Sequence, residues 1–147
     1  MAETLPLCEF DEATLVARLD VTVRGDVRAV TPAVEEIMKV VREMGCAAGK
    51  EFEIELALTE ALANAVEHGC AGDPRKKAQV CVGCDPDRGL LIVVRDPGPG
   101  FDPSQVPSPV TGERIFATGG RGIFLINRLM DDVHYTRGGT EIRLRKR

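Results

Sequence analysis

Residues 90–101 read LLIVVRDPGPGF, an apolar run that ends in an acidic residue and two glycines. The apolar run predicts a buried strand, which Asp96 closes. Because Gly98 and Gly100 lack Cβ atoms, the backbone after the strand can approach a flat ligand, and an aspartate can accept a hydrogen bond from an exocyclic amine. By itself the motif fits a plain Asp-Pro-Gly turn better than a ligand site, because short motifs often occur by chance.

Two polar residues upstream of this strand, Glu60 and Asn64, stand four positions apart in the stretch EALANAVEH, residues 60–68. Helical spacing places them on one face, where both side chains can reach the same point. Amide and carboxylate oxygens suit Mg²⁺ or its waters, and a carboxylate can accept a proton from an attacking hydroxyl. The alternative is a solvated polar stripe, which the apolar neighbours of the pair disfavour. His68 fits this group no better than it fits an interaction with the helix dipole.

A second glycine cluster, TGGRG at residues 118–122, precedes an apolar stretch that predicts a helix over 123–130. A flexible backbone joined to a helix N-terminus presents free N–H groups to phosphates, with Arg121 as an added charge. The cluster is not a Walker P-loop, because no Gly-Lys-Ser/Thr follows it. A loop that merely reverses the chain remains the alternative. Thr140 can donate or accept a hydrogen bond near a nucleotide, but a hairpin residue is the simpler interpretation.

The remaining patterns predict one α+β domain over residues 1–147, with an N-terminal strand segment in residues 1–25. Thr31 before Pro32 is typical of a helix cap, and Gly45 of a helix stop. The order of elements predicts a mixed, mostly antiparallel sheet with helices on one face, which is a two-layer α/β sandwich. The expected elements are strands 15–23, 79–84, 90–95, 133–136 and 140–145, helices 31–45, 50–67 and 123–130, and a loop at 101–118.

Composition excludes several classes of function. At 44% apolar and 29% charged residues the chain is typical of a globular protein rather than a disordered one. A net charge of −4 provides no global attraction for nucleic acid or anionic membranes. Neither a signal peptide nor an apolar run of membrane-spanning length is present. We therefore expect a cytoplasmic protein that binds neither nucleic acid nor membrane.

Five cysteines are an odd number, which favours free thiols in a reducing compartment. Cys81 and Cys84 form a lone CxxC motif inside a predicted strand. Residues three apart on a strand point to opposite faces, and zinc would need two further ligands. The motif therefore predicts neither a metal site nor a redox site.

Taken together, four motifs in this order resemble the conserved boxes of the GHKL ATPases. Residues 122–133, the size of the chain and the short loop between glycine boxes look like one branch, the anti-sigma factor serine/threonine kinases of the RsbW and SpoIIAB type. The resemblance covers roughly residues 30–145. The motifs are Glu60-x-x-x-Asn64, Asp96-x-Gly98-x-Gly100-Phe101, Gly119-Gly120-Arg121-Gly122 and Gly139-Thr140.

The resemblance implies a Bergerat-type α/β sandwich that binds ATP and Mg²⁺. It implies that Glu60 is the base toward a serine or threonine hydroxyl and that Asn64 binds Mg²⁺. Asp96 would contact the adenine amino group, and Thr140 would contact adenine through water. The other implied nucleotide-binding segments are Gly98 and Gly100 at the adenine pocket, residues 101–118 as the ATP lid, and Gly120, Arg121 and Gly122 at the phosphates.

The implied partners are a small STAS-type anti-anti-sigma protein, which carries the phosphorylated serine, a sigma factor, and a second copy of the chain. The competing hypothesis is a nucleotide-dependent binding switch without appreciable phosphoryl transfer. The presence of Glu60 and Asn64 favours the kinase, since a pure nucleotide sensor could dispense with a base. A histidine-kinase catalytic domain fits less well, because the chain has two histidines and no dimerisation helix pair.

Overall fold

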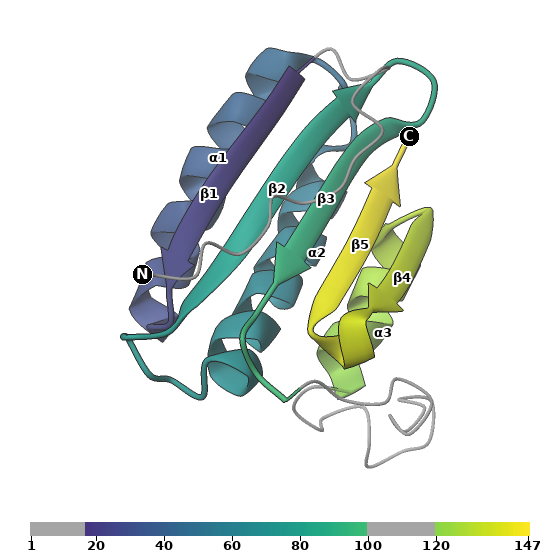
Figure 1. Ribbon diagram of the computed structural model, residues 1–147. Coiled ribbons are helices and arrows are strands. Elements are labelled where there is room, and N and C mark those ends of the chain that lie inside the picture. Colours follow the sequence, from purple (N-terminus) through teal and green to yellow (C-terminus); the bar gives the residue numbers. More distant parts are fainter. Residues whose placement is uncertain (1–16, 100–119) are drawn as a thin grey trace.

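A computed structural model describes residues 17–99 and 120–147, in which five strands form one sheet and three helices cover one face of it (Figure 1). The strand order is β1-β2-β3-β5-β4. No helix in the described part of the chain has both the length and the apolar character needed to cross a membrane. The elements are β1 (Ala17–Arg24), η1 (Val27–Ala29), α1 (Val30–Met44), α2 (Glu51–Asn64), η2 (Ala65–Gly69), β2 (Lys77–Asp85), β3 (Gly89–Arg95), α3 (Gly120–Leu129), β4 (Asp132–Thr136), η5 (Arg137–Gly139) and β5 (Glu141–Lys146).

The predicted two-layer α+β sandwich is confirmed, and its sheet is antiparallel at each of the described pairings rather than mixed. Two helices, α1 and α2, connect β1 to β2. The chain therefore crosses the molecule twice between these strands, and β2 returns antiparallel to β1. A single crossover helix would have made the two strands parallel.

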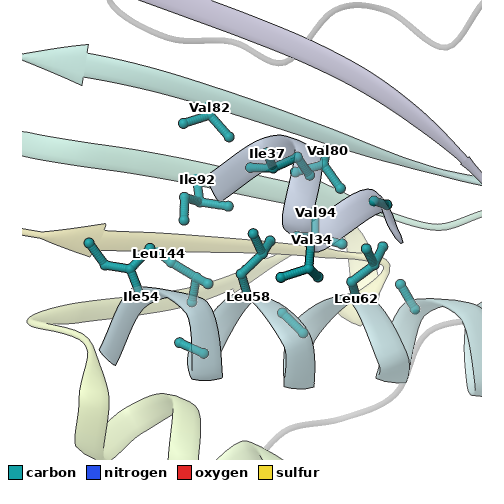
Figure 2. Packing of buried hydrophobic residues seen from close by; sticks show 14 of the residues in the cluster. Val34, Ile37, Ile54, Leu58, Leu62, Val80, Val82, Ile92, Val94 and Leu144 are labelled. Carbon is teal, nitrogen blue, oxygen red and sulfur yellow. The ribbon is translucent and has the colours of Figure 1, made fainter. Parts of the chain in front are cut away.

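The core lies between the sheet and the helices, as Figure 2 shows. Alternate residues of the strands point to the helical face because side chains on a strand alternate between faces. Each such side chain stabilises the fold by about 1.5–3 kcal/mol relative to an exposed position. The labelled residues are Val34 and Ile37 of α1, Ile54, Leu58 and Leu62 of α2, and Val80, Val82, Ile92, Val94 and Leu144 of the sheet, each at most 3% exposed.

The start of α1 differs from the prediction. Thr31 does not cap the helix, which begins at Val30 after the short turn η1. Asp26 caps that turn instead, because its side chain accepts a hydrogen bond of 2.9 Å from the Arg28 N–H. Pro32 is accommodated in the first turn of α1, where an N–H has no intrahelical partner. The predicted stop at Gly45 is confirmed, with a left-handed φ of 75°.

The predicted helix over 50–67 is regular only as far as Asn64. The next five residues, η2, form a π-turn, in which the N–H of Cys70 donates to the carbonyl of Ala65 at 2.9 Å. π-turns are rare, and inside helices they often occur at functional sites. This turn follows directly on one of the residues singled out from the sequence.

The expectation of free thiols was wrong for Cys46, Cys81 and Cys84, each of which is disulfide-bonded. Cys46, in the connection between α1 and α2, forms a disulfide with Cys84 at the end of β2, with Cα atoms 5.9 Å apart. The two residues are 38 positions apart in the sequence, so only the packing of this connection against the sheet brings them together. Cys70 is a free, buried thiol. Cys81 and Cys84 do lie on opposite faces of the sheet, as predicted: Cys84 registers with the core-facing Leu90, and Cys81 is buried apart from the main core.

Candidate functional site

Four chain segments lie at the same end of the strands (Figure 1). They are the C-terminal end of α2 with η2, the end of β3, the start of α3 and the turn before β5. Each of these segments carries residues singled out from the sequence. The fold therefore gathers motifs that are far apart in the chain, namely Glu60 and Asn64, Asp96 and Gly98, Gly120, and Thr140.

Asp96 is held from both sides by backbone hydrogen bonds. Its N–H donates to the carbonyl of Thr140 at 2.9 Å, which extends the pairing of β3 with β5 by one residue. The N–H of Gly98 donates to Oδ1 of Asp96 at 2.8 Å. Burial raises the pKa of Asp96, although the Gly98 N–H and the charge of His68 act in the opposite direction. The result is a half-buried carboxylate whose Oδ1 accepts a hydrogen bond from the turn.

The end of η2 touches the turn after β3 through two glycines. A Cβ atom added to Gly69 would lie 2.1 Å from Cγ of Asp96, and one added to Gly98 would lie 2.6 Å from Cα of Gly69. Real Cβ atoms do not come this close to other heavy atoms, so both positions require glycine as the chain now stands. This contact joins the motif on α2 to the motif after β3.

Glu60 and Asn64 are half-buried on α2, one helical turn apart. Asn64 is the last residue of the regular helix, and its side chain makes no capping hydrogen bond to η2. Among the described residues no three His, Cys, Asp or Glu side chains converge as a metal cage. Mg²⁺ on a nucleotide needs no such cage, because one or two protein oxygens supplement phosphates and waters. The donor set of this pair therefore fits a nucleotide-bound Mg²⁺.

A buried ion pair supports the ends of β3 and β5, and sequence reasoning missed it. Arg95 and Glu141 are cross-strand partners, 3% and 2% exposed, and the guanidinium donates to the carboxylate. Thr136 and Arg143 also donate to Glu141, at 2.6 and 2.9 Å. Arg95 and Glu141 are the direct chain neighbours of Asp96 and Thr140. Their ion pair therefore fixes the strand ends that carry Asp96 and Thr140. The only signal in the sequence is an arginine that ends an apolar strand, which does not reveal its partner.

Thr140 follows a tight turn in which Arg137 and Gly138 have left-handed φ values of 55° and 67°. Its hydroxyl donates to the carbonyl of Arg137 at 2.8 Å, as expected of a hairpin residue. Its carbonyl, rather than its hydroxyl, makes the described contact with Asp96. The strands predicted over 133–136 and 140–145 are confirmed as the hairpin of β4 and β5, which η5 connects.

The helix predicted over 123–130 is present, but it begins three residues earlier, so that Gly120, Arg121 and Gly122 form the first turn of α3. The first N–H groups of a helix lack intrahelical partners and favour anions. The side chain of Arg121, the predicted lid over 101–118 and Gly100 lie outside the described residues.

Comparison with known proteins gives one family and a group of relatives. The family model for the histidine kinase-like ATPase domain matches residues 23–146. Serine-protein kinase RsbW of Bacillus licheniformis is 30% identical over 117 residues, which are 70% of this chain and 72% of that protein. RsbW of a second Bacillus licheniformis strain is 31% identical over 119 residues, 71% of this chain and 73% of its own length. RsbW of Bacillus subtilis strain 168 is 30% identical over 102 residues, 64% of this chain and 62% of its own length.

Proposed function

The chain belongs to the histidine kinase-like ATPase domain family, and on that premise we propose that it is an ATP-dependent serine/threonine protein kinase. The similarity to serine-protein kinases supports this proposal over other activities of the family. The observation that carries it is the contact of Gly69 with Asp96, since it brings the helix of Glu60 and Asn64 against the turn of Asp96. One compact site then contains an acceptor for adenine, a metal ligand and a base.

In the proposed complex, Asp96 accepts a hydrogen bond from the exocyclic amine of adenine through Oδ2. Gly98 and Gly100 form the wall of the adenine pocket, and Thr140 contacts the base through water. The N–H groups of Gly120 and Gly122 bind the phosphates, with Arg121 as an added positive charge. Asn64 holds Mg²⁺, which neutralises charge on the phosphates.

Phosphoryl transfer asks little covalent chemistry of the protein beyond positioning and a base. We assign the base to Glu60, which accepts the proton of the substrate hydroxyl. The hydroxyl oxygen forms a bond to the γ-phosphorus as the bond from that phosphorus to the ADP oxygen breaks. The products are a phosphorylated side chain and ADP, with the proton on Glu60.

The proposed protein substrate is a STAS-domain anti-anti-sigma protein, and the proposed regulated partner is a sigma factor, which the chain would sequester as a homodimer in the cytoplasm. The choice of these two partners rests on the resemblance to the anti-sigma factor branch. Phosphorylation of the STAS protein would then determine whether the chain holds the sigma factor.

The test is transfer of γ-labelled phosphate from ATP·Mg²⁺ to STAS-domain proteins of the same genome. Glu60→Gln should lower transfer about 100-fold or more while ADP binding persists, because it removes the base alone. Asn64→Ala should abolish transfer together with the Mg²⁺ dependence of nucleotide binding. Glu53→Gln is the matched control, since this carboxylate lies two helical turns away and pairs with Lys146 at 3.0 Å.

The outcomes separate the hypotheses. Full transfer by Glu60→Gln would refute the assignment of the base. Tight ATP binding by the wild type without labelling of a STAS protein would favour the nucleotide-dependent binding switch. Absence of ATP binding would refute both.

A further inference from the structure

We infer that Gly69 is a positioning residue for the adenine-binding carboxylate, so that the π-turn after α2 helps to determine which base the site accepts. The inference rests on the proposed function, because it assumes that Asp96 contacts the exocyclic amine of adenine. It adds a residue that acts through Asp96 and would not itself touch the nucleotide.

The side chain of Asp96 lies where a Cβ atom of residue 69 would be. The three heavy atoms nearest to an added Cβ all belong to Asp96: Cγ at 2.1 Å, and Cβ and Oδ1 at 2.3 Å each. Gly69 does not have a positive φ, so its backbone would accept an L-residue. Glycine is therefore required here by the carboxylate and not by the conformation of the turn.

The backbone of Asp96 has little freedom to retreat from such a Cβ atom. Its N–H is bonded to Thr140, and the preceding residue, Arg95, is buried in the ion pair with Glu141. On the other side Gly98 already contacts Gly69. A methyl group at position 69 would therefore turn the side chain of Asp96 and break the bond from the Gly98 N–H to Oδ1, which moves Oδ2 away from its position.

The π-turn explains why Gly69 reaches this position. A π-turn adds a residue to the helical turn and thereby widens it. The turn closes from Cys70 to Ala65, and the N–H of Gly72 then donates to Val66 at 3.3 Å. Both bonds anchor the segment on each side of Gly69, so the contact with Asp96 is part of a fixed turn.

The experiment compares the affinity for ATP with that for purine riboside triphosphate, which lacks only the exocyclic amine. In the wild type the ratio should be about 10 to 100, as expected for a hydrogen bond to a charged group. Gly69→Ala should bring this ratio close to that of Asp96→Ala. A merely structural defect would weaken both nucleotides alike and leave the ratio unchanged.

The matched control is Gly72→Ala. Gly72 lies three residues further on and has a φ of 69°, but an added Cβ would meet no heavy atom within 4 Å. This variant strains the backbone without touching Asp96, so its ratio should remain that of the wild type. A wild-type ratio in Gly69→Ala, with a reduced ratio in Asp96→Ala, would overturn the inference and leave the proposed adenine contact intact. A wild-type ratio in Asp96→Ala would overturn the adenine contact and the inference with it.

A double variant keeps the inference testable if Gly69→Ala does not fold. Asp96→Gly removes the three heavy atoms that lie nearest to the new methyl group. The urea midpoint of Gly69→Ala/Asp96→Gly should therefore equal that of Asp96→Gly, although Gly69→Ala alone unfolds at lower urea. An equal loss of stability in both backgrounds would show that the methyl group meets something other than Asp96.

Discussion

At the scale of single residues, the environment of Asp96 shifts its pKa, and the proposed adenine contact depends on whether this carboxyl is ionised. Burial raises the pKa of this carboxyl above the 3.8 of an ordinary aspartate, and the nearby charge of His68 lowers it. The charged form is the stronger acceptor for an exocyclic amine. The proposed adenine contact should therefore fail at a higher pH than an unperturbed aspartate would allow.

We expect the preference for ADP over purine riboside diphosphate to fall as the pH drops through the raised pKa of Asp96. The ratio of the two affinities is the quantity to measure, because phosphate titration affects both ligands equally. In His68→Ala, the loss should begin at a higher pH, since a charge that lowers the pKa is gone. Asp96→Asn serves as the control, and its ratio should not change with pH. A constant wild-type ratio between about pH 4 and 7 would contradict the prediction.

Glu141→Gln should lower the free energy of unfolding by about 3–5 kcal/mol, because it removes the charge of the carboxylate that pairs with the buried Arg95 guanidinium. Burial raises the pKa of Glu141, but hydrogen bonds from Thr136, Arg95 and Arg143 outweigh this effect, and the net pKa lies below 4.5. Its stabilisation is thus complete above the unfolded-state pKa and is lost as the pH falls through the lowered folded-state pKa.

Urea denaturation at neutral pH and in acid provides the measurement. Asp20→Asn is a suitable control, since its ion pair with Arg18 at 3.1 Å is solvent-exposed and should contribute about 0–1 kcal/mol. Equal losses in the two variants would show that the buried pair contributes no more than a surface pair.

At the scale of elements, the Cys46–Cys84 disulfide ties the connection between α1 and α2 to the far end of β2. It closes a loop of 38 residues, and its reduction should lower the free energy of unfolding by about 2–4 kcal/mol. Nucleotide affinity should not change, because β2 ends at the end of the strands that lies away from Asp96 (Figure 1). Urea midpoints and nucleotide titrations with and without dithiothreitol test both statements. Cys46→Ser removes this disulfide alone and should lower the free energy of unfolding by about 2–4 kcal/mol, whereas dithiothreitol also reduces the disulfide of Cys81. A loss of binding in Cys46→Ser would contradict the stated independence.

The helix α2 shows why local patterns predict an element better than its ends. Its spacing of polar and apolar residues predicted a helix over 50–67. The π-turn Ala65–Gly69 was not predicted, because the spacing of polar and apolar residues does not specify its hydrogen-bond pattern. The predicted start of α1 was wrong for a local reason: Asp26 caps η1, which leads into α1 before the Thr31-Pro32 signal.

At the scale of the whole molecule, stability depends on the layer between sheet and helices (Figure 2). Leu58→Ala should lower the free energy of unfolding by about 2–5 kcal/mol, because Leu58 is fully buried and leaves a cavity. Phe52→Ala, on the same helix, should change it by less than about 0.5 kcal/mol, since Phe52 is 72% exposed. Chemical denaturation of the two variants measures the difference. A large loss for Phe52→Ala would show that this side chain is covered in solution.

The sequence by itself determined the elements, the fold class and the candidate motifs of this protein, because periods of 2 and 3.6 residues and glycine-rich turns are local properties. Asp96, Glu60 and Asn64 were all identifiable in this way. Only the tertiary structure decided that Gly69 meets Asp96, that Arg95 pairs with Glu141 across 46 positions, and that Cys46 bonds to Cys84. These contacts join segments that are distant in the chain, and they depend on how the layers pack, which no local pattern specifies.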